Sequence, residues 1–145
     1  MEKQKLLDIA RRSMDAFNAR DWNRFGEVLS PNAVYDEIGT GRRVTGRDSV
    51  VDLTRGWSVA FPDLKGTIDH SVASDDYVLC EVTYKGTQDG ELKAPSGSVA
   101  PSHKPVTTRC VQSFHVADGH VVEMRNYFDM LHVLQAVNAL PSKTT

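Results

Sequence analysis

The main change in the spacing of the apolar residues comes at Pro62, and this change limits the folds that the chain can form. Before Pro62 apolar residues recur every three or four positions, which is the pattern of one face of an amphipathic helix. These stripes contain Leu6, Ala10, Met14 and Phe17, then Val50, Leu53, Thr54, Trp57 and Phe61. After Pro62 apolar and polar residues alternate, as in half-buried strands. Helices followed by a sheet favour an α+β fold and exclude a parallel sheet of alternating strands and helices.

Local signals predict where the elements begin and end. Asp21 and Asp48 are candidate N-caps for the second and third helices, and Pro62 ends the third. Asp118-Gly119 is a two-residue hairpin signal. The predicted strands cover residues 33–38, 64–72, 77–87, 107–117 and 120–128, residues 88–104 are predicted to be a loop, and a last helical stripe contains Met130, Val133, Leu134 and Val137.

Length and charge bound the class of protein. The 145 residues fit one domain, 1–145. With 17 Lys and Arg against 19 Asp and Glu, the net charge of −2 gives no basic surface for nucleic acid or an anionic membrane. No apolar run approaches the roughly 18–20 residues of a membrane span, and the N-terminus lacks a signal-like apolar stretch. Cys80 and Cys110 suit a reducing compartment, so we expect a cytoplasmic protein.

The predicted hairpin around Asp118-Gly119 places a mixed set of side chains on one face. An unbroken register sets Gln112 opposite Arg125 and Cys110 opposite Tyr127. That face then carries Cys110, Gln112, Phe114, Val116, Val121, Glu123, Arg125 and Tyr127, with Asp129 extending the row. Apolar walls with a few polar groups are typical of a ligand pocket, although a solvated sheet face would show the same mixture. The opposite face, with Val111, Val122, Met124 and Phe128, is a candidate subunit interface.

Four segments carry a resemblance to a known family. They are Ala-Phe-Pro-Asp-Leu at 60–64, Gly-Thr-Gln-Asp-Gly-Glu-Leu at 86–92, Asp-Gly-His-Val-Val-Glu at 118–123 and Arg-Asn-Tyr-Phe-Asp at 125–129. Over roughly residues 5–140 the chain resembles the SnoaL-like polyketide cyclases of the nuclear-transport-factor-2-like (NTF2-like) superfamily. The resemblance implies a cone-shaped barrel, in which a curved antiparallel sheet wraps around N-terminal helices and an internal pocket. It also implies no metal or organic cofactor, and a homodimer or higher homo-oligomer.

The resemblance also implies a reaction and its residues. Asp129 matches the acid/base of an intramolecular aldol closure, so the expected substrate is a small hydrophobic carbonyl compound such as a polyketide-type ester. Gln112, Arg125 and Tyr127 would orient the substrate, and Phe114 and Trp57 would form apolar walls. To donate a proton at neutral pH, Asp129 needs a pKa well above its usual value of about 3.9, which burial in a water-poor pocket would supply.

Other interpretations of the same residues remain open. Asp129 precedes the last helical stripe, where an aspartate is also a favoured N-cap. Gln112 cannot shuttle protons at neutral pH, and Ser102-His103 stands where the family has Thr-Gly, so the substrate can differ from that of the cyclases. A second hypothesis is a ketosteroid-isomerase-like isomerase or hydrolase that uses a carboxylate of the Asp36-Glu37 pair, here Asp36, with Tyr127, although such a pair near Gly39 is also typical of an exposed turn. A third is a non-catalytic protein that binds a hydrophobic ligand.

Overall fold

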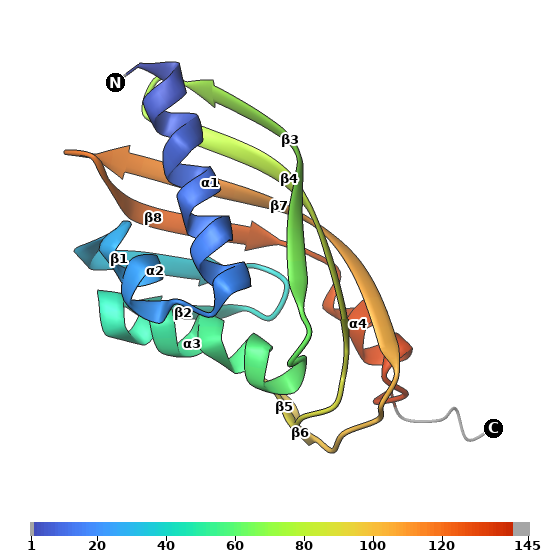
Figure 1. Ribbon diagram of the computed structural model, residues 1–145. Helices are drawn as coiled ribbons and strands as arrows, with labels where there is room; N and C mark the ends of the chain where they lie inside the picture. The colour runs from blue at the N-terminus through green and yellow to red at the C-terminus, as the bar shows by residue number, and fades with distance from the viewer. Residues whose placement is uncertain (1, 141–145) are drawn as a thin grey trace.

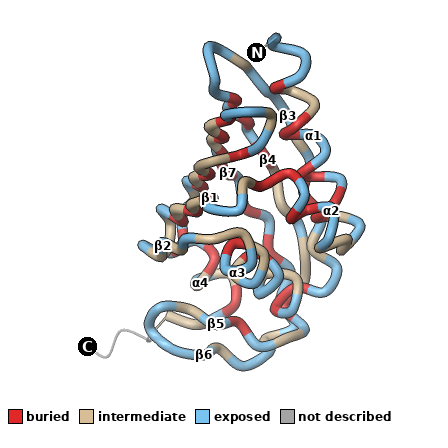
Figure 2. The backbone as a smooth tube through the Cα atoms, turned by 90° about the vertical axis from the view of Figure 1, so that its left-hand side faces the viewer, coloured by how far each residue is buried: buried red, intermediate tan, exposed pale blue. Residues whose placement is uncertain are grey.

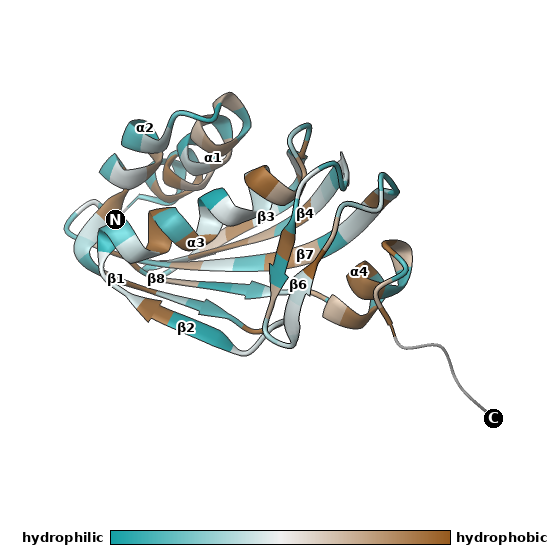
Figure 3. Cartoon of the chain, turned by 90° about the horizontal axis from the view of Figure 1, so that it is seen from below, coloured by the Kyte–Doolittle hydropathy of each residue, from teal (hydrophilic) through white to brown (hydrophobic). Residues whose placement is uncertain are grey.

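The computed structural model describes residues 2–140, in which three helices cover one face of a curved sheet (Figures 1 and 3). In chain order the elements are α1 (Lys3–Ala19), α2 (Trp22–Glu27), β1 (Leu29–Glu37), β2 (Arg42–Thr45), α3 (Arg47–Ala60), β3 (Lys65–Ser74), β4 (Tyr77–Thr87), β5 (Leu92–Ala94), β6 (Gly97–Val99), β7 (Pro105–Ala117), β8 (His120–Tyr127) and α4 (Met130–Ala136). Helices α1, α2 and α3 lie on the covered face, and α4 lies beside one end of the sheet. Among residues 2–140, no helix combines the length and the apolar character that a membrane crossing requires.

The six-stranded sheet is mixed and open, which corrects the predicted antiparallel barrel. Its strand order is β2-β1-β8-β7-β4-β3, so β2 and β3 are free edges. Strand β1 runs parallel to β8, and the other neighbouring pairs are antiparallel. The parallel pair is possible because most of the chain separates the two strands, as a parallel crossover requires. The α+β order predicted from the change in spacing is confirmed.

Two of the three aspartates considered as helix caps act as caps. The Asp21 carboxylate accepts the Arg24 N–H at 3.1 Å and begins α2, as predicted. The Asp48 prediction was wrong, because α3 begins after Gly46, whose φ of 102° suits glycine, and no side chain caps it. Asp48 lies in the first turn of α3 instead, where its negative charge favours the helix dipole. The third aspartate, Asp129, precedes α4 and is described with the site.

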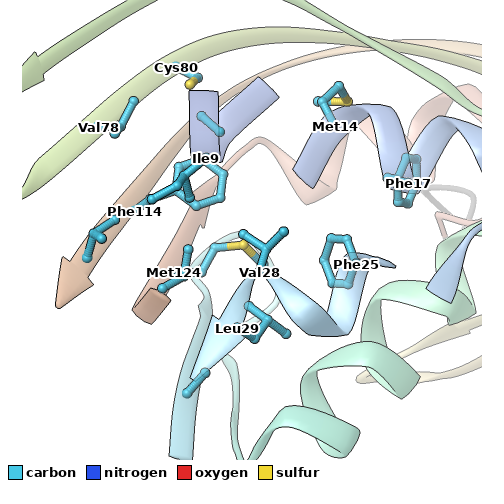
Figure 4. Close-up of a cluster of buried hydrophobic side chains, with 14 of the residues drawn as sticks. Ile9, Met14, Phe17, Phe25, Val28, Leu29, Val78, Cys80, Phe114 and Met124 are labelled. Carbon is cyan, nitrogen blue, oxygen red and sulfur yellow. The ribbon is translucent and has the colours of Figure 1, made fainter. Parts of the chain in front are cut away.

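The core lies between the helices and the inner face of the sheet. Ile9 of α1 lies beside Cys80 and Phe114 of the strands, and Met14 and Phe17 of α1 belong to the same buried cluster (Figure 4). Buried and exposed residues alternate along β4 and β7, so each strand gives every second side chain to the core (Figure 2). A second apolar cluster lies around α4 and contains Ala60, Phe61, Leu92, Val106, Met130, Val133 and Val137.

A β-bulge in β8 moves the residues of this strand that follow it to the face opposite the predicted one. The turn at Asp118-Gly119 is as predicted, with φ of 51° and 76°. His115 pairs with Glu123, but its neighbour Val116 pairs with Val121, so Val122 is an extra residue. Beyond this bulge the inside and outside positions of β8 are reversed.

Residues 88–104 were predicted to be a loop, but they contain the hairpin of β5 and β6. The side chain of Gln88, which is fully buried, lies at the base of this hairpin. The two N–H groups of the Gln88 side-chain amide are shared among the carbonyl oxygens of Gly90, Val99 and Ala100 at 3.1–3.2 Å, and its oxygen accepts the Ser102 N–H at 3.1 Å. Gln88 therefore stabilises this segment.

Candidate ligand pocket

A mainly apolar cavity lies between the helices and the inner sheet face. Its volume is about 80 Å³. Helices α1 and α3 and strands β1, β4, β7 and β8 all contribute to its wall. The lining residues are Ser13, Met14, Phe17, Phe25, Tyr35, Thr54, Trp57, Phe61, Leu64, Tyr84, Val106, Thr108, Cys110, Gln112, Met124, Asn126, Phe128 and Val133. Apolar walls with a few polar groups are the usual composition of a small-molecule site.

Two tyrosines and two amides form a hydrogen-bonded group in this wall, which we call the tyrosine–amide tetrad (Tyr35, Tyr84, Gln112 and Asn126). Gln112 on β7 lies directly opposite Asn126 on β8. Gln112 Nε2 donates to the hydroxyl of Tyr84 at 2.8 Å, and Asn126 Nδ2 donates to the hydroxyl of Tyr35 at 3.3 Å. Each hydroxyl thus accepts an amide N–H, and its own proton can be donated to a ligand.

The ionisable groups of the cavity wall are neutral at physiological pH. Burial raises the pKa of Tyr35 and of Tyr84 well above the usual value for a phenol. Burial also raises the pKa of the Cys110 thiol to about 12. Both phenols and the thiol therefore keep their protons, and the cavity offers neutral hydrogen-bond donors.

Three further polar atoms in the lining have no hydrogen-bond partner within residues 2–140. They are Thr54 Oγ1, Thr108 Oγ1 and Asn126 Oδ1, and all three residues are at least nine-tenths buried. Buried polar atoms in folded proteins are nearly always paired, so these three oxygens are exceptions among the residues that line the cavity.

Trp57, a predicted apolar wall, lines the cavity and is held by a buried carboxylate. Its ring stacks on Phe61 and meets Phe128 edge to face. The fully buried Glu37 accepts the Trp57 Nε1–H at 2.9 Å through Oε2. Its other oxygen, Oε1, accepts Arg42 Nη2 at 2.6 Å and the Thr40 hydroxyl at 2.5 Å. Glu37 is thus an ion-paired positioning residue, and both of its oxygens are occupied.

The structure brings only two of the predicted site residues to the cavity wall, Gln112 and Trp57. Phe114 is buried in the main core cluster and is not among the lining residues. Arg125 pairs with Glu123 at 3.0 Å on the outer sheet face, and Tyr127 on the same face is 42% exposed. The prediction that Arg125 and Tyr127 face the pocket was wrong, because the bulge at Val122 turns both side chains to the outer face. Met124 and Phe128, predicted for a subunit interface, line the cavity instead.

Asp36 and Asp129 also lie outside the cavity lining. Asp36 pairs with Arg43 at 3.1 Å on the outer face, while the neighbouring residues Tyr35 and Glu37 point inward. Asp129 is exposed, and its carboxylate accepts the His132 N–H at 3.2 Å as the N-cap of α4. The water-poor surroundings expected for Asp129 are therefore not observed, because the cap position at the start of α4 faces solvent.

The site residues predicted from the sequence did not include Tyr35, Tyr84 or Asn126, and Glu37 was considered only as the neighbour of Asp36. Tyr35 and Glu37 share one face with Ala33, so the alternation along β1 could have identified them. Asn126 was assigned to the wrong face by the unbroken register. Within residues 2–140, no three His, Cys, Asp or Glu side chains lie close enough together to hold a metal ion.

Helices on one face of a curved open sheet, with a cavity between them, define the class of the protein. It is an α+β protein of the NTF2-like type, and solved structures with this fold include ketosteroid-isomerase-like proteins and an epoxide hydrolase of M. tuberculosis. The family model described as SnoaL-like polyketide cyclase matches residues 7–137. The chain belongs to this family.

Individual relatives resemble the chain in sequence or in fold. The chain is 29% identical over 129 residues to the sordarin/hypoxysordarin biosynthesis cluster protein G of Sordaria araneosa, a match that covers 88% of this chain and 82% of the relative. A structure from Jannaschia sp. CCS1 assigned to the SnoaL-like polyketide cyclases has a TM-score of 0.85 at 25% identity and covers 96% of this chain and 95% of that one. IdmH of Streptomyces antibioticus, itself proposed to be a polyketide cyclase, has a TM-score of 0.76 at 24% identity, covers 90% and 96%, and supports the fold alone.

We predict that Asp129 contributes to stability and not to the chemistry. Asp129→Ala removes the cap and should lower the free energy of unfolding by about 0.5–2 kcal/mol. Asp129→Asn retains a good N-cap and should leave both stability and turnover unchanged. Denaturant titration and a turnover assay on the same preparations measure the two effects. A folded Asp129→Asn protein that loses turnover would restore the acid/base role.

We also predict that Glu37 holds Trp57 in the wall. Glu37→Ala leaves the Trp57 N–H and the partly buried Arg42 without their acceptor, and should lower the free energy of unfolding by about 2–4 kcal/mol. In a Trp22→Phe background, Trp57 is the tryptophan that remains, so its emission should shift in the same variant. Asp36→Ala, on the same strand but partly exposed, is the matched control and should cost less than about 1 kcal/mol. Equal losses in the two variants would contradict the role of Glu37.

Proposed function

We propose that this protein is an enzyme that closes a ring in a small hydrophobic carbonyl compound of the polyketide type. The observation that carries the proposal is the tyrosine–amide tetrad in the cavity wall. The buried phenol of Tyr35 and the partly buried phenol of Tyr84 each accept an amide N–H and retain a proton for a carbonyl oxygen of the substrate. Membership of the SnoaL-like polyketide cyclase family supports ring closure as the reaction.

The chemical role of the two phenols is to stabilise developing negative charge. When a carbon nucleophile attacks a carbonyl, negative charge accumulates on the carbonyl oxygen. A fixed donor within a low-dielectric cavity stabilises this charge more than water does, because the donor needs no reorganisation. The apolar walls formed by Trp57, Phe61 and Phe128 hold the substrate in a folded conformation, which lowers the entropic barrier to ring closure.

An aldol closure is compatible with a cavity wall that carries no carboxylate among residues 2–140. The enol form of a 1,3-dicarbonyl compound is already a carbon nucleophile. Its π electrons form the new carbon–carbon bond, the attacked carbonyl becomes the alcohol oxygen, and the enol O–H proton passes to that oxygen. The reaction is an isomerisation, so it balances without a base, oxidant or cofactor.

The alternative functions receive less support from the geometry. An isomerase or hydrolase that uses Asp36 needs this carboxylate in the cavity, but Asp36 pairs with Arg43 on the outer face. A non-catalytic binding protein would use the same cavity and differs from the enzyme only in turnover. A second copy of the chain as a partner stays a prediction.

Removal of either cavity phenol tests the proposal. The substitutions Tyr35→Phe and Tyr84→Phe should each lower kcat for cyclisation by about 10- to 1000-fold. The upper end of this range is the loss in kcat that follows removal of one oxyanion-hole donor. Tyr127→Phe, on the exposed outer face, is the matched control and should leave kcat unchanged. Linear 1,3-dicarbonyl esters of graded length serve as substrates, and chromatography separates each cyclic isomer from its precursor.

Two results would contradict the proposal. One is that both cavity variants cyclise a substrate of the wild-type protein at the wild-type rate. The other is that wild-type protein binds the esters, shown by a raised melting temperature, and converts none of them.

A further inference from the structure

Gly66 of β3 lies where a side chain would meet two residues of the cavity wall. Its register partner on β4 is Tyr84, a member of the tyrosine–amide tetrad. A Cβ atom at position 66 would overlap with the sulfur of Met14 and would lie only 2.7 Å from Cε1 of the Tyr84 ring. The φ of Gly66 is not positive, so alanine fits this backbone and the lack of space is what opposes it. A glycine inside a strand often marks such a close approach.

The side chain of Asn18 binds the backbone of Gly66 at the free edge of the sheet. Asn18 lies in the last turn of α1, beside β3 (Figure 1). Its Nδ2 donates to the Gly66 carbonyl oxygen at 2.9 Å, and its Oδ1 accepts the Gly66 N–H at 2.9 Å. Because both backbone groups bond to Asn18, Gly66 and Tyr84 form the non-hydrogen-bonded type of pair, in which facing residues are closest.

The Tyr84 ring is also contacted from α1 and β7. Phe17 meets it edge to face with 5.7 Å between the ring centroids, and its hydroxyl accepts Gln112 Nε2 at 2.8 Å. The long side chain of Met14 can turn away from an added Cβ, but a ring with few rotatable bonds that is held on several sides cannot. A side chain at position 66 would therefore displace Tyr84 relative to Gln112.

We propose that Gly66 and Asn18 are positioning residues for the hydroxyl of Tyr84. Gly66 leaves the space in which the ring lies, and Asn18 fixes the place of β3 beside that ring. A shift of about 1 Å in a catalytic group can cost about 100-fold in rate, so a small displacement reaches the chemistry. This inference rests on the proposed function in taking Tyr84 as a donor to the substrate carbonyl, whereas the fixing of the ring does not depend on it.

Fluorine NMR tests the positioning without any turnover. The four tyrosines of the chain are replaced by 3-fluorotyrosine, and the Tyr84 resonance is the one that is lost in Tyr84→Phe. This resonance should move by more than its linewidth in Gly66→Ala. It should stay in place in Gly56→Ala, the matched control, because a Cβ at the exposed Gly56 meets nothing within 4 Å. An unchanged Tyr84 resonance in folded Gly66→Ala protein would overturn the proposal.

The substitution Asn18→Ala tests the same point without adding an atom, and it decides if Gly66→Ala does not fold. Loss of the two hydrogen bonds to Gly66 should move or broaden the Tyr84 resonance. Asn23→Ala removes an exposed asparagine amide from α2, so it is the control and should leave this resonance unchanged. Equal spectra of the two asparagine variants would contradict the role of Asn18.

Turnover tests whether the position of the hydroxyl matters to the reaction. Gly66→Ala should lower kcat by about 10- to 100-fold and change KM by less than about twofold, because the donor acts mainly in the transition state. In a Tyr84→Phe background there is no hydroxyl to misplace, so the same substitution should cause no further loss of kcat. A loss of equal size in both backgrounds would mean that Gly66 does not act through Tyr84, and would overturn the proposal.

The outcome is separable from that of the proposed function. A displaced Tyr84 resonance in Gly66→Ala, with no cyclisation of the esters by wild-type protein, would support the positioning of the ring and contradict the enzyme. Cyclisation by wild-type protein with an unchanged resonance in the folded variants would do the reverse.

Discussion

The extra residue in β8 determines which side chains face the cavity. Because Val122 is unpaired, Asn126 lies opposite Gln112, and Arg125 and Tyr127 point to the outer face. Asn126 also pairs with Glu37 of β1, so Gln112, Asn126 and Glu37 form a polar row across three neighbouring strands. An unbroken hairpin would bring Arg125 into the cavity in place of the amide of Asn126. The neutral character of the cavity therefore depends on this bulge.

Neutral polar groups suit an apolar cavity better than charged ones. A charged side chain in the wall would need a partner or a large change of pKa, because burial strongly disfavours the ionised form. The one fully buried carboxylate in the described chain, Glu37, meets this requirement with Arg42 and serves to hold Trp57. The remaining polar lining consists of hydroxyls and amides, whose hydrogen bonds gain strength where water is excluded. Chemistry at such a site depends on positioning and on hydrogen bonding to a carbonyl group.

The sequence predicts the order of elements well because that order follows from local periodicity and turn residues. The helical stripes, the cap at Asp21, the turn at Asp118-Gly119 and the last helix all depend on neighbours in the chain. The bulge at Val122 has no such signature, since valine fits a regular strand equally well. The parallel pairing of β1 with β8 joins segments that are distant in the chain. The role of Asp129 could not be predicted from the sequence, because an aspartate serves equally as a helix cap and as a catalytic acid.

The pH dependence of cyclisation tests most directly whether neutral donors carry the reaction. The phenols of Tyr35 and Tyr84 and the Cys110 thiol have raised pKa values, so their protonated forms persist through neutral pH and are lost only in alkaline solution. If neutral donors carry the reaction, kcat should be constant between about pH 6 and pH 9, because no lining group changes its charge there. A kcat that falls in acid solution with the loss of a single ionised carboxylate would contradict this prediction.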